Sequence, residues 1–221
     1  MILSCVVTHD RLPLTKRCIG SLLATQRPED RLVVVDNAST DGTQDYLRAL
    51  PKDVAVVLLP ENRFPGAATN IGWDTGLRRW SLPLLHRSDN DIEYLPGWQD
   101  QVEAAFAENR DLVLLGILNL HEDRRIDATD ETGIDEVDAV GGNVVMPRCR
   151  FRKGLRWGEE PWGVVHYEDS VMSHNAKRLG RVARLRRTVA NNMAFNGALE
   201  FPEYYQRTAA LRGIRDWQHS T

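Results

Sequence analysis

The feature that most constrains the fold is an alternation of short apolar runs and helix-like segments along the first half of the chain. The runs occupy residues 2–7, 32–35, 54–59, 82–86 and 112–118. Continuous apolar runs of this length are typical of strands that are buried on both faces. The alternation therefore predicts an α/β fold with a mostly parallel central sheet and helices on both faces of the sheet.

Helix signals lie between these runs. Pro13 precedes apolar residues at four-residue spacing, and Asp41 with Gln44 three residues later resembles a helix cap. Further helices are expected at residues 67–79, 99–109 and 168–179.

The second half of the chain is less regular. We expect a loop or lid at residues 121–136, a strand at 139–146, irregular structure at 148–163 and a helical tail at 202–217. With 221 residues and no internal repeat, the chain suits one domain with a short appendage.

Composition and charge exclude several classes of protein. The net charge of −3 gives no overall bias toward nucleic acid or an acidic membrane. Three cysteines without a CxxC spacing argue against a disulfide scaffold and for a reducing compartment. No apolar stretch approaches the roughly 20 residues that span a bilayer. We therefore expect a cytoplasmic protein without a transmembrane segment.

Polar residues follow the strands of the expected sheet. Thr8, Asp36, Asn62 and Asp89 each come directly after an apolar run or shortly beyond it. Ligands of parallel sheets bind outside the carboxyl ends of the strands. The sequence therefore predicts a ligand site at this edge.

Two acids one residue apart, Asp89 and Asp91, stand out at that edge. Such a pair after a strand can chelate one hard divalent cation, which in turn can hold a diphosphate. The alternative is a solvated acidic turn, which is the commoner origin of an isolated Asp-x-Asp.

Five motifs in order resemble the glycosyltransferases of family 2, inverting enzymes with the GT-A fold. They are VVTHDR (6–11), VVVDNASTDGT (33–43), ENRFPGAATNIG (61–72), DND with PGW (89–91 and 96–98) and YED (167–169). The resemblance covers residues 2–190. It implies one GT-A-type catalytic domain at 1–200, with a nucleotide-sugar-binding half at 1–118, an acceptor-binding half at 119–200 and a C-terminal helical tail at 201–221.

The resemblance implies that a nucleoside-diphosphate sugar is the donor substrate. The residues that match donor-binding positions are Thr8, Arg11, Asp36, Asn37, Arg63, Gly66, Asn70, Asp89 and Asn90. By the same analogy, Asp36 recognises the base or ribose. Asp91 binds Mn²⁺ or Mg²⁺ directly, while Asp89 contacts the ribose or the water on the metal.

The YED motif supplies the candidate catalytic carboxylates. Inversion in a single displacement requires a carboxylate that deprotonates the acceptor hydroxyl. Asp169 is the first candidate for this base and Glu168 is the second. The alternative is that both acids only complement the dipole of the helix that they begin.

The chain departs from the family pattern at one place. Many relatives carry a histidine after the late helix that completes the metal site, but residues 188–197 contain none. Asn191, Asn192 and Asn196 occupy this stretch, and His166 lies just before the acidic motif. The third metal ligand therefore stays open.

The acceptor is not identified by the sequence. Trp157 and Trp162 could stack on sugar rings or pack in the core or lid, and Gly142 allows a close approach. Basic clusters at 148–156 and 177–187 could be solvated faces or could hold a phosphate-rich partner. Glycan, lipid-linked glycan, protein and modified nucleic acid stay open as acceptors, as does the oligomeric state.

Two other functions compete with glycosyl transfer. A nucleotidyltransferase on a related sheet would carry a glycine-rich loop after the first strand, but residues 8–13 contain no glycine. A non-catalytic nucleotide-sugar-binding module would explain the missing histidine, but not the presence of Asp89, Asp91 and Asp169.

Overall fold

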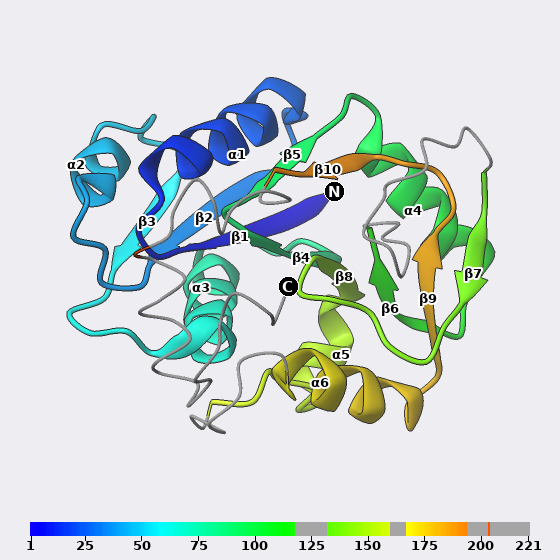
Figure 1. Cartoon of the computed structure of the whole chain (residues 1–221). Coiled ribbons are helices and arrows are strands. Elements are labelled where there is room, and N and C mark those ends of the chain that lie inside the picture. The colour runs from blue at the N-terminus through cyan, green and yellow to red at the C-terminus, as the bar shows by residue number, and fades with distance from the viewer. Residues whose placement is uncertain (118–131, 160–166, 194–202, 204–221) are drawn as a thin grey trace.

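The computed structural model describes residues 1–117, 132–159, 167–193 and 203 (Figure 1). Trp162, His166 and Asn196 lie outside the described residues, as do almost all of the expected tail and the loop at 121–131. Within the described residues, no helix is both long and apolar enough to cross a membrane.

One large sheet runs through the described part of the chain. Its strands, in spatial order, are β3 (Ala55–Leu58), β2 (Arg31–Asp36), β1 (Ile2–Thr8), β4 (Leu84–Asp89), β8 (Val144–Pro147), β6 (Leu112–Gly116), β9 (Arg181–Leu185) and β7 (Ile134–Glu136). β3, β2, β1 and β4 are parallel, as are β6 and β9, whereas β8 and β7 run antiparallel to their neighbours. The mostly parallel sheet expected from the sequence is confirmed.

A second, two-stranded sheet lies beside the end of β4. β5 (Ile92–Tyr94) follows β4 after a two-residue turn and pairs antiparallel with β10 (Ala190–Asn192). This pairing brings the late segment of the chain next to the acidic turn that contains Asp91. The backbone N–H of Met193 donates to the carbonyl of Asp91 at 2.8 Å.

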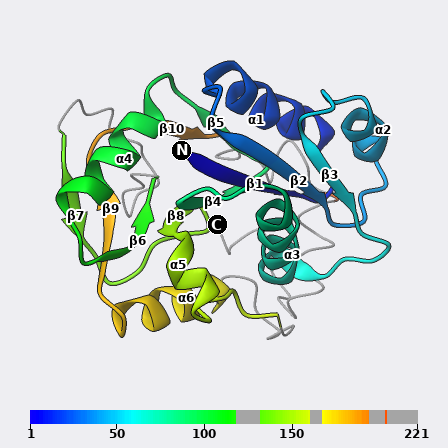
Figure 2. The ribbon, with the colours of Figure 1, turned by 180° about the vertical axis from the view of Figure 1, so that it is seen from behind.

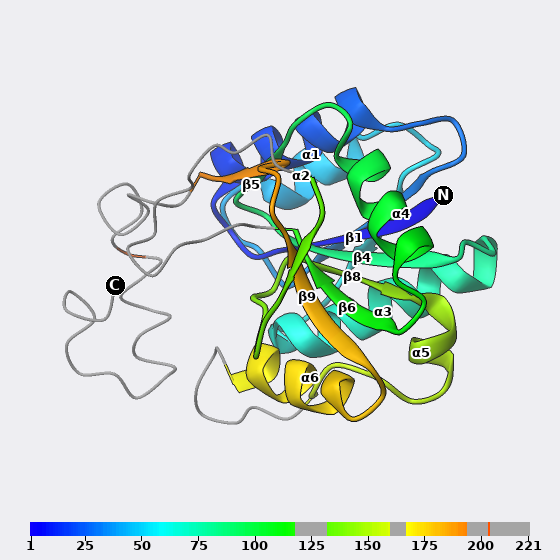
Figure 3. The same ribbon diagram turned by 90° about the vertical axis from the view of Figure 1, so that its right-hand side faces the viewer.

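Helices cover both faces of the large sheet (Figure 3). They are α1 (Leu12–Thr25), α2 (Thr43–Arg48), α3 (Phe64–Arg79), α4 (Trp98–Glu108), α5 (Arg148–Arg152) and α6 (Tyr167–Lys177). α1, α2 and α4 contribute to the core on one face, and α3, α5 and α6 to the core on the other. Seen from behind, α3 lies against β1 and β2 (Figure 2).

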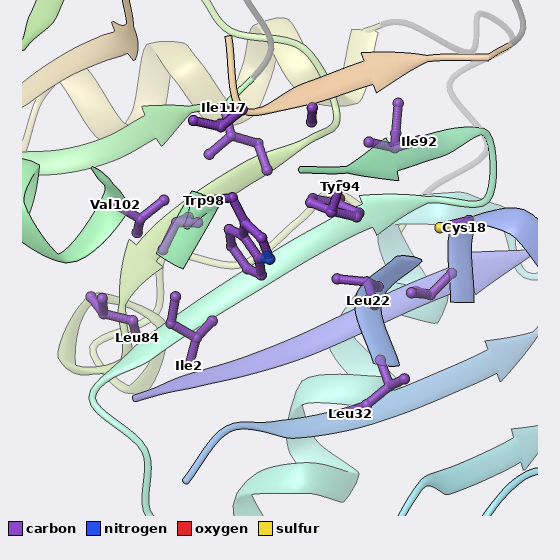
Figure 4. Packing of buried hydrophobic residues seen from close by; sticks show 14 of the residues in the cluster. Ile2, Cys18, Leu22, Leu32, Leu84, Ile92, Tyr94, Trp98, Val102 and Ile117 are labelled. Carbon is purple, nitrogen blue, oxygen red and sulfur yellow. The ribbon is translucent and has the colours of Figure 1, made fainter. Parts of the chain in front are cut away.

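Alternate residues of each central strand feed the two cores. Ile2 and Val6 of β1 pack with Cys18, Leu22 and Trp98 on one face (Figure 4). The residues between them, such as Leu3 and Cys5, pack on the other face with Trp73. Burial on both faces explains why these strands read as continuous apolar runs.

Four expectations for the second half of the chain need correction. The strand expected at 139–146 begins only at Val144, and the region expected to be irregular at 148–163 begins with helix α5. The end of the expected loop at 121–136 forms β7, and β9 and β10 were not expected at all. β7, α5, β9 and β10 are only 3–5 residues long and contain polar or charged residues, so they lack the apolar run that marks the equally short β3 and β6.

The close approach of α3 to the sheet gives a first prediction. A Cβ atom at Gly72 would clash with Cys5 Sγ and would lie 2.8 Å from Val35 Cγ2. Gly72→Ala should therefore lower the free energy of unfolding by about 1–3 kcal/mol, as measured by urea denaturation.

Gly20→Ala is the matched control, because Gly20 is an exposed helical residue and a Cβ atom added to it would meet nothing within 4 Å. This change should be neutral or stabilise by about 0.5–1 kcal/mol. Equal effects of the two substitutions would contradict the tight packing of α3.

Candidate active site

The carboxyl ends of β1, β2 and β4 lie level with one another. Thr8 is in register with Asp36, and Val7 is in register with Asp89. Residues that are far apart in the chain thus meet at one edge of the sheet, as the sequence predicted.

The loops at this edge contain strained backbone. Asp10, Arg11, Ala38 and Phe64 have φ values between 53° and 63°, and they are the non-glycine residues with positive φ in the described part of the chain. They follow β1, β2 and β3, and each left-handed residue costs roughly 1–2 kcal/mol. Strain of this kind collects at functional sites, where the surrounding contacts enforce it.

Asn90 fastens the β1–α1 loop to the acidic turn. Its Nδ2 donates to the Thr15 hydroxyl at 2.8 Å, to the Asp10 carbonyl at 3.1 Å and to the Thr8 hydroxyl at 3.3 Å. Its Oδ1 accepts from the guanidinium of Arg11. Thr8 and Asn90 are both buried, so their side chains hold the shape of the edge.

Arg11 also binds the second acid of the motif. Its Nη1 donates to Asp91 Oδ2 at 3.0 Å, and both side chains are largely buried. Burial raises the pKa of Asp91, the Arg11 guanidinium opposes this shift, and the nearby Asp89 adds to it.

A buried chain of hydrogen bonds ends at the backbone carbonyl of Asp89. Tyr94 donates its hydroxyl proton to Ser88 Oγ at 2.7 Å, and Ser88 donates to the Asp89 carbonyl at 2.8 Å. The Tyr94 oxygen is then the acceptor for His86 Nε2–H at 3.0 Å, and the Ser4 hydroxyl donates to His86 Nδ1 at 2.9 Å. Burial lowers the pKa of His86 to about 3, which keeps this ring neutral.

Arg87 joins Asp89, at the end of β4, to the YED motif. Its Nη1 donates to Asp169 Oδ1 at 3.0 Å, and its Nη2 donates to Glu168 Oε1 at 3.2 Å and to Asp89 Oδ1 at 3.4 Å. The guanidinium carbon lies 4.0 Å from the centroid of the Trp157 ring. The structure thus brings together residues of β4, α6 and the segment before residue 160.

The pKa of Asp169 is raised to about 6. Burial is the largest cause, the Arg87 guanidinium opposes it, and the negative charges of Asp89 and Glu168 add to it. The Asp169 side chain is 22% exposed, so it is still accessible from solvent. A carboxylate with a pKa near neutrality is suited to proton transfer.

Asp36 presents an unsatisfied acceptor at the same edge. Its Oδ2 accepts from the Ser39 N–H at 3.0 Å and from Gln44 Nε2 at 2.9 Å, whereas its buried Oδ1 has no hydrogen-bond partner among the described residues. Next to it, Asn37 Oδ1 accepts from the Arg63 backbone N–H at 2.7 Å. The Asn37 side chain therefore fixes the loop that precedes α3.

Gly66 and Asn70 of α3 contact the segment around Trp157. Asn70 Nδ2 donates to the Trp157 carbonyl and to Glu159 Oε1, both at 2.9 Å, and Asn70 Oδ1 accepts from the Trp157 N–H at 3.2 Å. A Cβ atom at Gly66 would clash with the Gly158 carbonyl. In the structure these two residues position Trp157, and their expected donor contacts stay predictions.

Sequence reasoning missed two residues of this site, Arg87 and Asn143. Asn143 Oδ1 accepts from the Asp89 N–H at 2.9 Å, and its Nδ2 donates to Asp89 Oδ2 at 3.3 Å. Gly142 lies against the same carboxylate. Arg87 stands between the expected strand at 82–86 and Asp89, and this place in the sequence was the available signal.

The acidic turn suits a divalent cation that is shared with a phosphorylated ligand. Among the described residues, no three His, Cys, Asp or Glu side chains are grouped to hold an ion. Asp89, Asp91, Glu168 and Asp169 carry four carboxylates, against two guanidinium groups from Arg11 and Arg87, so this set is net negative. Mg²⁺ is commonly held by one or two carboxylates plus substrate phosphates, and Asp89 with Asp91 fit that pattern.

Comparison with known proteins gives a family and a fold. Residues 4–172 match the family model described as glycosyl transferase family 2. No curated protein sequence matches the chain. The family match favours glycosyl transfer over the competing nucleotidyl transfer.

Solved structures with the same fold are distant in sequence. TarS 1–349 from S. aureus superposes with a TM-score of 0.66 at 19% identity, over 95% of this chain and 64% of that one. The complex of TarS 1–349 with UDP-GlcNAc gives 0.68 at 18% identity, over 95% and 66%. GalNAc-T7 with UDP, GalNAc and Mn²⁺ gives 0.64 at 14% identity, over 84% and 42%. The chain thus spans less than two thirds of these solved chains, and the expected GT-A-type fold is confirmed.

The hydrogen bonds between Asn70 and the segment around Trp157 give a second prediction. Asn70→Asp keeps an acceptor for the Trp157 N–H but replaces the donor that faces the Trp157 carbonyl and Glu159. We expect the free energy of unfolding to fall by about 1–3 kcal/mol, because a buried acceptor loses its partner.

Adding Glu159→Gln tests the cause of that loss. Glutamine removes the negative charge and offers a donor, so the double variant should recover part of the stability in urea denaturation. No recovery would contradict the Asn70–Glu159 contact.

Proposed function

Because the chain belongs to glycosyl transferase family 2, we propose that it transfers a sugar from a nucleoside-diphosphate sugar to an acceptor hydroxyl, with inversion at the anomeric carbon. The observation that carries this proposal is the link through Arg87 between Asp89 at the end of β4 and Asp169 at the start of α6. One guanidinium contacts an acid suited to the donor and an acid suited to the acceptor.

The donor would bind along the carboxyl edge of β1, β2 and β4. Oδ1 of Asp36, which has no partner among the described residues, is available to an N–H or O–H group of the base or ribose. Arg11 offers positive charge to the diphosphate beside Asp91. TarS, which shares the fold, has been solved with UDP and with UDP-GlcNAc, which supports a nucleotide sugar as the donor class.

Asp169 would act as the base of a single displacement. It removes the proton of the acceptor hydroxyl while the acceptor oxygen bonds to the anomeric carbon. The bond from that carbon to the diphosphate oxygen breaks, and the nucleoside diphosphate leaves with the electron pair. A pKa of about 6 leaves Asp169 ionised at neutral pH while keeping it basic enough to accept the proton.

A divalent cation, Mn²⁺ or Mg²⁺, would be held by Asp91 and Asp89. When bound, it would neutralise charge on the departing diphosphate. Arg11 and Arg87 contact the same carboxylates, so metal affinity should be low until the diphosphate adds its oxygen atoms. Asn191 lies in β10 next to β5 and stays a candidate for the place of the missing histidine.

A panel of donors tests this function. We would measure binding of UDP-, GDP- and dTDP-sugars by calorimetry, and release of nucleoside diphosphate with water as the acceptor, in Mn²⁺ or EDTA. We expect one nucleotide class to bind and to be hydrolysed slowly, with release dependent on Mn²⁺. If no member of the panel binds or is hydrolysed, the proposal is wrong; release in EDTA would contradict only the metal.

The role of Asp169 predicts a pH dependence. The base must be ionised, so turnover should be constant above its pKa of about 6 and should fall as the pH drops below that value. The loss should be about tenfold per pH unit. Asp169→Asn should reduce turnover by about 10²–10⁴-fold at neutral pH while the nucleotide still binds.

Glu168→Gln is the comparison, since it neutralises the neighbouring acid on the same guanidinium. It should lose less turnover than Asp169→Asn and should keep the acid limb of the pH profile. The reverse order would make Glu168 the base. Asp74→Asn, on the surface pair with Arg156, controls for general loss of charge.

A further inference from the structure

Arg87 is an unusual residue for its position in β4. The strand lies at the centre of the sheet between β1 and β8, and the Arg87 side chain is only 2% exposed. Its neighbour Leu85 is an ordinary core residue. An arginine here needs a reason, because burial of a guanidinium costs several kcal/mol before its partners offset it.

Stability does not supply that reason. A buried ion pair often contributes no more to stability than apolar residues of similar volume would. An apolar residue here, with apolar residues in place of its acidic partners, would complete the core without desolvating any charge. The guanidinium nevertheless contacts three carboxylates and one indole ring.

The carboxylates that Arg87 contacts come from two separate segments of the chain. Asp89 belongs to the acidic turn, whereas Glu168 and Asp169 lie in the first turn of α6, far away in the chain. The guanidinium is a planar fork with fixed donor directions, so each acid that it contacts has a restricted orientation. The face of the fork lies over the Trp157 ring, which restricts the plane of the fork itself.

The bond to Asp169 uses one carboxylate oxygen only. Arg87 Nη1 donates to Oδ1, and Oδ2 has no hydrogen bond to another described residue. Within the described part of the chain, Oδ2 is therefore the carboxylate oxygen left to accept the proton of an acceptor hydroxyl.

We propose that Arg87 is a positioning residue of the transfer reaction, which holds Asp169 with Oδ2 directed to the acceptor and fixes it relative to Asp89. This inference rests on the proposed function, in which Asp169 is the base. Arg87 itself exchanges no proton and contacts no reacting atom. Without the guanidinium, three nearby carboxylates would repel one another, and the base would leave its place.

The role predicts a loss of turnover rather than of donor binding. In the full-length protein, with the donor identified by the panel, Arg87→Met should lower kcat by about 10²-fold, which is typical when a catalytic group is displaced by about 1 Å. The donor KM should change by less than about threefold, because Arg87 contacts only one of the donor-side groups.

Rescue separates positioning from a general structural role. Arg87→Lys keeps the charge but loses the fork, so it should recover only part of kcat. Methylguanidinium added to Arg87→Ala should raise kcat in a saturable way. Arg79→Met is the matched control, because the Arg79 guanidinium also lies against an indole ring (Trp80, 4.9 Å from its centroid), but at the C-terminal end of α3, away from the carboxyl ends of β1, β2 and β4. Its kcat should equal that of the wild type.

Three outcomes would overturn the inference. The first is an unchanged kcat per folded molecule in Arg87→Met while the wild type turns over. The second is a loss confined to KM, and the third is a loss that neither lysine nor methylguanidinium relieves. If Arg87→Met does not fold, Arg87→Lys carries the same test of kcat against KM. Absence of turnover in the wild type is a different result, since it contradicts the proposed function itself.

Discussion

The structure of the site depends on one buried guanidinium among three carboxylates. Arg87 contacts Asp89, Glu168 and Asp169, and the ring of Trp157 lies against its face. The positive charge between these acids offsets their mutual repulsion. A single positive charge inside the sheet therefore decides where the acids of two distant motifs lie.

The fold explains how such a cluster can be assembled. Parallel strands end at the same edge, so Thr8, Asp36 and Asp89 meet there although they are far apart in sequence. The strained loop after β1 is then held by Asn90, and the loop after β2 by the bond from the Ser39 N–H to Asp36. The late segment closes the arrangement, because β10 pairs with β5 directly after the acidic turn.

Much of the fold and several residues of the site could be predicted from the sequence, because buried strands and the polar residues at their carboxyl ends form local patterns. The acids Asp36, Asp89 and Asp169 were identified at the strand ends and helix start where the structure places them. Arg87 could not be assigned, since two of its three carboxylate partners are 81 and 82 positions away and a charged residue in isolation suggests a solvated face. Strand β9 was not predicted for a related reason. Its pairing with β6 is determined by tertiary contacts, not by a local pattern.

The most direct test of this account is the state of the Arg87 side chain in solution. In ¹⁵N NMR of the guanidinium groups, a buried fork bonded to three carboxylates should show separate Nη resonances with slow rotation about the Cζ–N bonds. Asp169→Asn should change those resonances. A single averaged signal from Arg87 in the wild-type protein, as an exposed arginine gives, would contradict the claim that this guanidinium organises the site.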